Sequence, residues 1–347
     1  MVVANRSTSS LWPTVVLATV VVIGLAGILF VSADNKNQGS AGGEDGSCDS
    51  DTNTAKYPHQ VGSSLLYHFD AIVSTQDEAR KIVMMQSTGN GDGDGESIQI
   101  TEDIQTVIVT AAEQSQGRGT GGRVWLSTRG NTFVTICIRQ SAWMHTTLPM
   151  TLLPIKVGQI MAEHIHQLIM SCFHNGMEDA TQPPPMVNIK WPNDVLVDDN
   201  KISGVLIESA NDWFLIGIGV NVAQAPEIPT SGPNHGRVST SIRSHCQLTD
   251  VTTTEEFVVM ARDLGQTMGF DLNEWLSRFP MQDAADVASE RNRLVQEWRG
   301  WVDWDLTLTM RDETKEVVKP VDIEPDGRLR VRGWDGQDRL IVADYFF

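Results

Sequence analysis

The sequence predicts an α/β protein of the α+β type, in which helices pack on a mixed sheet. Three observations carry this prediction. Short apolar runs with strand-like spacing recur over residues 64–222. Residues 149–173 carry a long apolar stripe, as expected for a helix that packs on a sheet. After residue 306, short alternating segments are separated by Asp-Gly turns, which predicts a small all-β module at the end of the chain.

The amino terminus is predicted to form a hydrophobic helix. Residues from Leu11 to Val31 carry no charge, and this length matches the hydrocarbon core of a bilayer. The run also fits a cleaved signal peptide, because Val31-Ser32-Ala33 resembles a cleavage site. We therefore expect residues 1–33 to be either a single-pass membrane anchor or a signal for secretory or organelle entry. Residues 34–63 are expected to form a flexible linker, because Gly, Ser, Asn and Asp dominate its first part.

From residue 64 on, hydrophobic periodicity predicts a succession of strands and helices. Thr75 and Glu78 have capping-box spacing at the start of a helix over 74–86. Thr253 and Glu256 repeat that spacing for a helix that ends near Gly269. Asp198-Asp199-Asn200 is typical of a hairpin turn. Strands are expected at 65–72, 104–112, 133–139, 187–191, 195–197, 202–209, 213–222, 306–310, 328–331 and 340–342, and further helices at 149–173 and, in two stretches, up to about 299.

Composition excludes several classes of protein. The 347 residues include 44 acids and 26 bases, for a formal charge of −18. A binder of duplex nucleic acid needs a basic face, so binding of DNA or RNA is not expected as the main activity. The four cysteines are far apart and form no CxxC pair, which argues against a disulfide framework or a zinc site. We interpret them as small hydrophobic residues.

A glycine-rich loop follows the predicted strand at 104–112. It reads Gly117-Arg118-Gly119-Thr120-Gly121-Gly122-Arg123-Val124-Trp125. Glycines let the backbone approach a ligand closely, and arginines donate charge-assisted hydrogen bonds to phosphate. The loop is not a P-loop, because no Gly-Lys-Ser/Thr ends it. These residues alone leave two alternatives open, an anion-binding loop and a mobile surface turn.

Two further segments combine polar side chains with strand ends. Lys190-Trp191-Pro192-Asn193-Asp194 ends one strand, and Lys201 follows across the predicted turn, so a hairpin would bring both lysines to one region. Gly217-Ile218-Gly219-Val220-Asn221 ends a buried strand. Its glycines fit either tight packing in a sheet or room for a flat ligand.

Together these segments resemble biotin protein ligases. The resemblance rests on Ser74-Thr75-Gln76, on Gln114 with the glycine-rich loop, on Lys190 to Asp194, on Lys201-Ile202-Ser203-Gly204, and on Gly217 to Asn221. Their order and spacing match the family from about residue 65 to 221. The chain departs from the family at Thr120, where many members have arginine, and at Gln76, where asparagine is usual. It also lacks an N-terminal helix-turn-helix, so the repressor role of some members is not expected.

The resemblance implies an ATP-dependent ligase that forms biotinyl-AMP and then transfers biotin to a lysine of a carrier domain. By resemblance, Lys201, Arg118, Lys190 and Asp194 are candidate catalytic residues, and Arg118, Arg123, Trp125 and Asn221 are candidate ATP ligands. Mg²⁺ is expected with the nucleotide, without a dedicated metal cage. The implied biotin ligands are Ser74, Thr75, Gln76, Gln114, Gly117, Arg118, Gly119, Thr120, Lys201, Gly204, Gly217 and Gly219.

The resemblance also implies a domain plan. We expect a class II synthetase-like catalytic domain over residues 64–299 and an SH3-like β barrel over residues 300–347. The expected partners are the biotin carboxyl carrier domains of biotin-dependent carboxylases, and the N-terminal segment would place the protein at a membrane. Two alternatives remain, a lipoate or octanoyl ligase of the same superfamily and a non-catalytic, membrane-tethered biotin-binding protein.

Overall fold

The computed structural model describes residues 56–85, 100–176, 183–228, 237–246, 253–279, 283–310 and 315–343. The predicted membrane or signal segment and most of the predicted linker lie outside these residues. Within the described part of the chain, no helix is both long and apolar enough to cross a bilayer.

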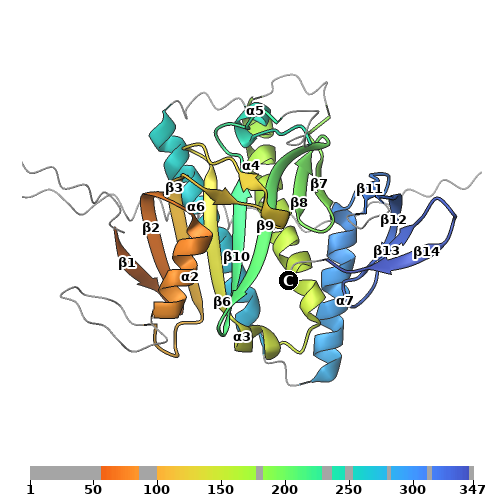
Figure 1. Cartoon of the computed structure of the whole chain (residues 1–347), viewed down its shortest axis with the longest axis horizontal. Coiled ribbons are helices and arrows are strands. Elements are labelled where there is room, and N and C mark those ends of the chain that lie inside the picture. Colours follow the sequence, from red (N-terminus) through yellow and green to blue (C-terminus); the bar gives the residue numbers. More distant parts are fainter. Residues whose placement is uncertain are drawn as a thin grey trace, which may run out of the picture. The chain divides into compact units, whose positions relative to one another are not determined.

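The central element is an eight-stranded sheet with the order β1-β2-β3-β6-β10-β9-β8-β7 (Figure 1). β2 and β3 run parallel, whereas the other neighbouring pairs are antiparallel, so the predicted mixed sheet is confirmed. Its strands are β1 (Lys56–Val61), β2 (Ser64–Ile72), β3 (Thr106–Gln114), β6 (Thr132–Arg139), β7 (Val187–Lys190), β8 (Asp194–Val197), β9 (Asn200–Ala210) and β10 (Trp213–Val220).

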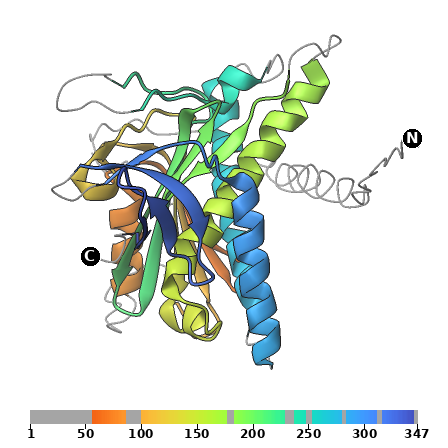
Figure 2. The same cartoon turned by 90° about the vertical axis from the view of Figure 1, so that its right-hand side faces the viewer.

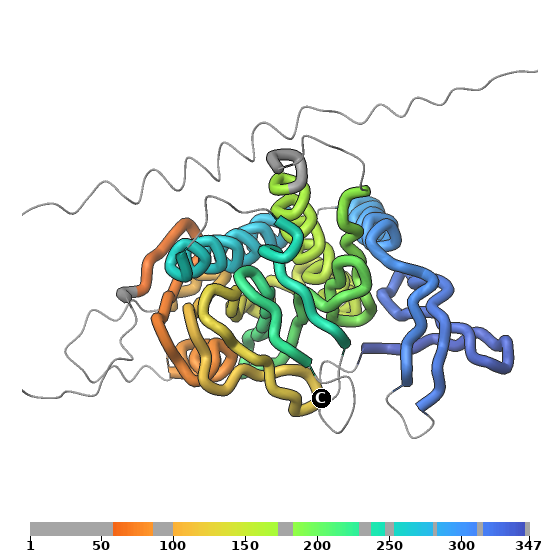
Figure 3. Tube along the Cα trace, turned by 90° about the horizontal axis from the view of Figure 1, so that it is seen from above, coloured from red at the N-terminus to blue at the C-terminus, as the bar shows by residue number. Residues whose placement is uncertain are grey.

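Helices cover both faces of this sheet, as Figures 1 and 3 show. α2 (Thr75–Met85) packs on β3, β6 and β10, while α4 (Leu153–Gly176) and α6 (Thr254–Ser277) pack on the opposite face. α7 (Ala284–Trp301) runs beside α4 (Figure 2). Short helices connect the larger elements: α3 (Gln140–Met144), α5 (Ile242–His245) and the 3-10 turn η3 (Met150–Leu152).

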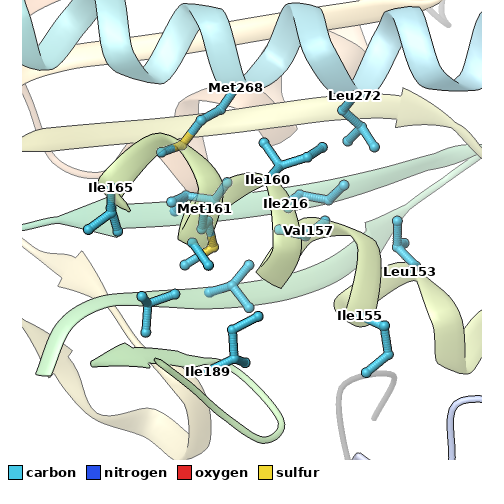
Figure 4. Close-up of a cluster of buried hydrophobic side chains, with 14 of the residues drawn as sticks. Leu153, Ile155, Val157, Ile160, Met161, Ile165, Ile189, Ile216, Met268 and Leu272 are labelled. Atoms are coloured by element: carbon cyan, nitrogen blue, oxygen red, sulfur yellow. The ribbon is translucent and has the colours of Figure 1, made fainter. Parts of the chain in front are cut away.

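Alternation along the strands separates a core face from a pocket face. On β10, Ile216 and Ile218 join the core beneath α4 and α6, and Figure 4 shows Ile216 near Met161 of α4. Successive side chains of a strand point to opposite faces. Gly217 and Gly219 therefore lie on the α2 face, where the missing side chains leave room above the sheet.

The end of the chain forms a second, antiparallel sheet with the order β11-β12-β13-β14, which confirms the predicted β segments there. It is attached to the helices by an ion pair from Arg299 Nε in α7 to Asp322 Oδ1 at 2.8 Å. Its buried residues, such as Val318 and Ile323, belong to the same core cluster as the helix face of the large sheet. The strands are β11 (Leu308–Thr309), β12 (Val317–Ile323), β13 (Leu329–Arg332) and β14 (Asp338–Ile341).

Two local expectations at helix ends are wrong. α6 continues past Gly269 to Ser277, because this glycine faces the sheet. A Cβ on Gly269 would lie 2.4 Å from Cδ1 of Ile108, so the glycine permits close helix–sheet packing and does not end the helix. Thr75 does not form a capping box with Glu78, since its hydroxyl lies 3.1 Å from Oε1 of Gln114. The capping box of Thr253 with Glu256 is confirmed.

Two further corrections concern the linker and the cysteines. Residues 56–61, which the sequence places in the linker, form β1 and pair with β2. Cys172 of α4 forms a disulfide with Cys246, with their Cα atoms 5.1 Å apart. Reading all four cysteines as small hydrophobic residues is therefore wrong for these two, because folding brings together positions that are distant in sequence. Cys137 is a buried free thiol, as expected.

Candidate active site

A cavity of about 700 Å³ opens on the pocket face of the large sheet, a size that suits a small-molecule ligand. Every predicted site residue except Gly117 lines it. Gly117 lies behind the wall, in the hairpin of β4 (Gly117–Arg118) and β5 (Val124–Trp125). A Cβ at this position would lie 2.4 Å from the carbonyl oxygen of Trp125, so the hairpin closes this tightly only with glycine.

One end of the cavity is formed by neutral polar groups that bond to one another. Gln114 Oε1 accepts hydrogen bonds from the backbone N–H of Thr75 at 2.7 Å and from its hydroxyl at 3.1 Å. Thr135 Oγ1 lies 3.0 Å from Thr75 Oγ1 and 3.1 Å from Gln76 Oε1. Thr75, Gln76 and Thr135 are buried, so this end is held in place before any ligand arrives.

The glycines of the floor are covered by two long side chains. Gln76 Oε1 would lie 2.6 Å from a Cβ on Gly217, and the indole of Trp125 would lie 2.4 Å from a Cβ on Gly219. Any larger residue at either position would displace the side chain above it. Trp125 Nε1 and Asn221 Oδ1 are buried with no hydrogen-bond partner among the described residues, which leaves one donor and one acceptor for a ligand or water.

The other end of the cavity concentrates positive charge in a strongly acidic chain. Arg123, Lys190, Lys201 and Arg237 line it, and among the described lining residues Asp194 is the sole carboxylate. Lys201 Nζ lies 2.6 Å from Asp194 Oδ1 and 5.5 Å from the centre of the Trp125 ring. Lys190 and Lys201 both line this end of the cavity, so the prediction that a hairpin brings the two lysines to one region is confirmed.

Lys190 shows the electrostatic strain of this cluster. Burial lowers its pKa most, and Arg237, Lys201 and Arg123 lower it further, while Asp194 opposes them. An anionic ligand would relieve the repulsion among these cations, so this end of the cavity suits carboxylate or phosphate.

Backbone hydrogen bonds position this cationic end. The N–H of Lys201 donates to the carbonyl of Val238 at 2.8 Å, and Thr240 N–H donates back to the carbonyl of Lys201 at 2.9 Å. Asn221 Nδ2 donates to the carbonyl of Thr240 at 3.0 Å. We call the segment 237–246 the strap. The Cys172–Cys246 disulfide ties its end to α4.

Arg118 differs from the other predicted cations because two carboxylates neutralise its guanidinium. Nη2 donates to Glu208 Oε1 at 2.6 Å, and Nη1 donates to Asp77 Oδ1 at 2.8 Å. Arg123, by contrast, uses Nε for the carbonyl of Thr120 at 3.0 Å and Nη2 for the Thr120 hydroxyl at 2.6 Å. The glycine-rich loop therefore carries one charge-balanced arginine and one that faces the cavity.

Sequence reasoning missed Arg237, Ser239 and Glu208. The first two belong to the strap, and nothing in the local sequence signals that the strap returns to Lys201. Glu208 lies on β9 and contacts Arg118 of the glycine-rich loop. Its alternation with buried Ile207 was a local signal that could have indicated the pocket face.

No cluster of three or more metal-ligating side chains occurs among the described residues. Near the cationic end, the oxygen atoms that could bind a metal ion belong to Asp194 and to neutral groups such as Asn221. Such a set fits a magnesium ion only when the ion arrives with nucleotide phosphates, which supply most of its oxygen ligands.

Comparison with known proteins agrees with the resemblance found in the sequence. Residues 75–222 match the Biotin/lipoate A/B protein ligase family. The biotin--[acetyl-CoA-carboxylase] ligase of Mycobacterium tuberculosis is 32% identical over 131 residues, which are 36% of this chain and 42% of that protein. The bifunctional ligase/repressor BirA of Bacillus subtilis is 30% identical over 173 residues, which are 48% of this chain and 42% of that protein. The matched segment spans less than half the length of these two relatives.

A solved structure supports the fold. The biotin protein ligase from Aquifex aeolicus in complex with biotin and ATP aligns with a TM-score of 0.51 and 18% identity, covering 81% of this chain and 96% of that one. At this identity the likeness bears on the fold alone. Residues 75–222 are thus similar to the Biotin/lipoate A/B protein ligase family, and the predicted site residues within this range, Gly117 excepted, line one cavity.

Proposed function

We propose that this protein activates biotin with ATP to biotinyl-AMP and then transfers biotin to a lysine of a carrier domain. One observation carries the proposal: the cavity joins a neutral, hydrogen-bonding end to an end with four cations and one carboxylate. Biotin has the matching polarity, since its ureido ring offers donors and an acceptor and its tail ends in a carboxylate. The ligase names of the relatives support the same assignment.

In the first step, a carboxylate oxygen of biotin attacks the α-phosphorus of ATP. A bond forms between this oxygen and phosphorus, and the bond from phosphorus to the β-phosphate bridging oxygen breaks, which releases pyrophosphate. Lys201 would lie beside both anions and offset their repulsion in the transition state, while Arg123 and Lys190 would hold the outer phosphates. Asn221 would contact the phosphates, and bound Mg²⁺ would supply further charge compensation.

In the second step, the amine of the acceptor lysine attacks the acyl carbon of biotinyl-AMP. An amide bond forms, AMP leaves, and the attacking amine loses a proton. Asp194, at the start of β8, would orient this amine, because it lines the cavity and its Oδ1 already binds an ammonium group, that of Lys201, at 2.6 Å. The proposed acceptors are the biotin carrier domains of carboxylases, as the name of the mycobacterial relative suggests.

A lipoate or octanoyl ligase is the main alternative, because the matched family includes both kinds of enzyme. The neutral end of the cavity favours biotin. A dithiolane ring or an alkyl chain can form no hydrogen bond with the polar groups at this end, such as those of Thr75 and Gln114, whereas a ureido ring can. Titration of the full chain with biotin and, separately, with lipoate by calorimetry tests this choice; tighter binding of lipoate would contradict the proposal.

The test of catalysis is pyrophosphate release from the full chain with biotin, ATP and Mg²⁺. We expect release that requires biotin and stops near one equivalent when no carrier domain is present. Biotin binding without pyrophosphate release would instead support the non-catalytic biotin-binding protein. Arg118, Gly119 and the cavity glycines stay predicted ligands of biotin until such complexes are measured.

A further inference from the structure

The glycine-rich loop is attached to the sheet by one salt-bridge network, which joins Arg118 of the cavity lining to carboxylates outside that lining. Glu208 of β9 is its centre. Its Oε1 accepts from Arg118 Nη2 at 2.6 Å, and its Oε2 accepts from Arg118 Nη1, Arg80 Nη2 and Gln76 Nε2, each at 3.1 Å. Asp77 adds the fifth bond, to Arg118 Nη1 at 2.8 Å.

This network neutralises Arg118. Two arginines, Arg80 and Arg118, face two carboxylates, Asp77 and Glu208, so the network carries no net charge. Glu208 engages both terminal nitrogens of Arg118, so a phosphate would compete with this two-point contact for the guanidinium. Arg123 has no carboxylate within ion-pair distance among the described residues, so the loop already presents an arginine to the cationic end.

The network also reaches the neutral end of the cavity. Gln76 donates one N–H to Glu208 and the other to the carbonyl of Leu215 at 3.2 Å, while its Oε1 faces Thr135. Its amide is therefore engaged within the protein on both sides. The loop, the helix α2 and the polar groups at the neutral end are held together through the single carboxylate of Glu208.

We propose that Arg118 is a tether and that Glu208 is the positioning residue that holds it. In this arrangement the guanidinium of Arg118 does not bind phosphate. It holds the backbone of Gly117 to Gly119 against the neutral end of the cavity, where the head group of the ligand lies. This inference rests on the proposed function for the identity of the ligand. The contact between Arg118 and Glu208 exists without a ligand, so it can be tested separately.

Exposed ion pairs often contribute little, so the burial and geometry of this one matter. The Glu208 side chain is 22% exposed, and it meets Arg118 through both oxygens, which is the strong, directional form of this interaction. The chain offers a matched control. Arg129 also bridges two carboxylates, Asp70 and Glu255, but away from the cavity lining.

The experiment measures biotin affinity of the full chain by calorimetry without nucleotide. We expect E208Q and R118A each to raise the Kd for biotin about tenfold, and the double variant to raise it no further, because both changes release the same contact. The control E255Q should bind biotin as the wild type does. A Kd in the double variant that is raised by the product of the two single effects would contradict the proposed tether. An unchanged Kd in E208Q would contradict it as well. So would an R118A variant that binds biotin normally but forms adenylate slowly, since that result assigns Arg118 to the phosphate.

A second readout does not depend on the ligand. Trypsin should cut after Arg123 faster in E208Q than in E255Q, at equal melting temperatures, because the loop has lost its attachment. Equal rates would contradict the tether. If the wild type binds no biotin, the proposed function fails, and the proteolysis comparison still decides whether Glu208 holds the loop.

Discussion

The two ends of the cavity are built on opposite principles. At the neutral end, Thr75, Gln76 and Gln114 bond to one another and to the sheet, so their geometry exists before a ligand binds. At the cationic end, the positive charges outnumber the carboxylates, and burial lowers the pKa of Lys190. The difference is one of physics: hydrogen bonds within the protein hold the neutral end in place, whereas the cationic end carries an excess of positive charge that attracts anions.

Removal of a cation should harm catalysis more than any change at the neutral end. For Lys201→Ala we expect adenylate formation to slow by on the order of 10²–10³, because the lost charge acts in the transition state. Single-turnover pyrophosphate release measures this rate, and circular dichroism checks that the fold survives. Lys319→Ala, which removes an exposed lysine on β12, is the matched control. Near-normal turnover in Lys201→Ala would refute its assignment.

Loss of the disulfide should act on the cationic end, because the strap carries Val238 and Thr240 to the backbone of Lys201. We expect the double change of Cys172 and Cys246 to alanine to lower the free energy of unfolding by about 3 kcal/mol. It should also raise the KM for ATP with little change in biotin affinity.

Chemical denaturation with and without reductant measures the effect of the disulfide. Reductant should destabilise the wild type and leave the double variant unchanged. Burial raises the pKa of the Cys137 thiol, which disfavours thiol exchange from this residue while the protein is folded. A wild type that is insensitive to reductant would show that the disulfide does not form in solution.

Thr120 lies in the glycine-rich loop and bonds to Arg123 of the cationic end. A substitution at Thr120 tests whether a further charge there would slow the release of the adenylate. An arginine offers more donors and a permanent charge, so Thr120→Arg should slow release of biotinyl-AMP roughly ten- to a hundredfold. Thr128→Arg places the same charge outside the cavity lining and should leave release unchanged. Equal or faster release from Thr120→Arg would mean that Arg123, which already bonds to Thr120, supplies the charge.

The smallest effect is expected from residues outside both ends. Removal of residues 1–55 should leave a soluble, active protein, because the described part of the chain begins with the strand at Lys56. Removal of residues 1–63 should lower the melting temperature, since it deletes β1 and exposes the edge of β2. Equal stability of the two truncations would show that β1 contributes nothing.

Comparison of the full chain with the chain that lacks residues 1–55 addresses the predicted membrane segment. The full chain should partition with membranes and the truncated chain should not, if residues 1–33 form an anchor. A shortened, secreted product would indicate a signal peptide. Localisation at a membrane stays a prediction until this is measured.

Much of the fold follows from local patterns. The strands of the large sheet from β2 to β10 occur close to where the apolar pattern predicts them, because a side-chain period of two is a property of the strand itself. The short strands β4 and β5 were not predicted, since the sequence there indicates a glycine-rich loop. The turn at Asp198 and Asp199 adopts positive φ values of 47° and 63°, as hairpin-turn residues do. The capping box at Thr253 also depends only on neighbours in sequence, so it was predictable.

The sequence alone therefore determined the mixed sheet, the motifs and the family resemblance, because these depend on residue type and short-range spacing. Tertiary structure decided which distant groups meet: Cys172 with Cys246, the strap with Lys201, and Glu208 with Arg118. It also decided that Gly269 packs against Ile108 instead of ending a helix. These outcomes depend on the path of the chain through space, and no local propensity records which side chain a residue will face.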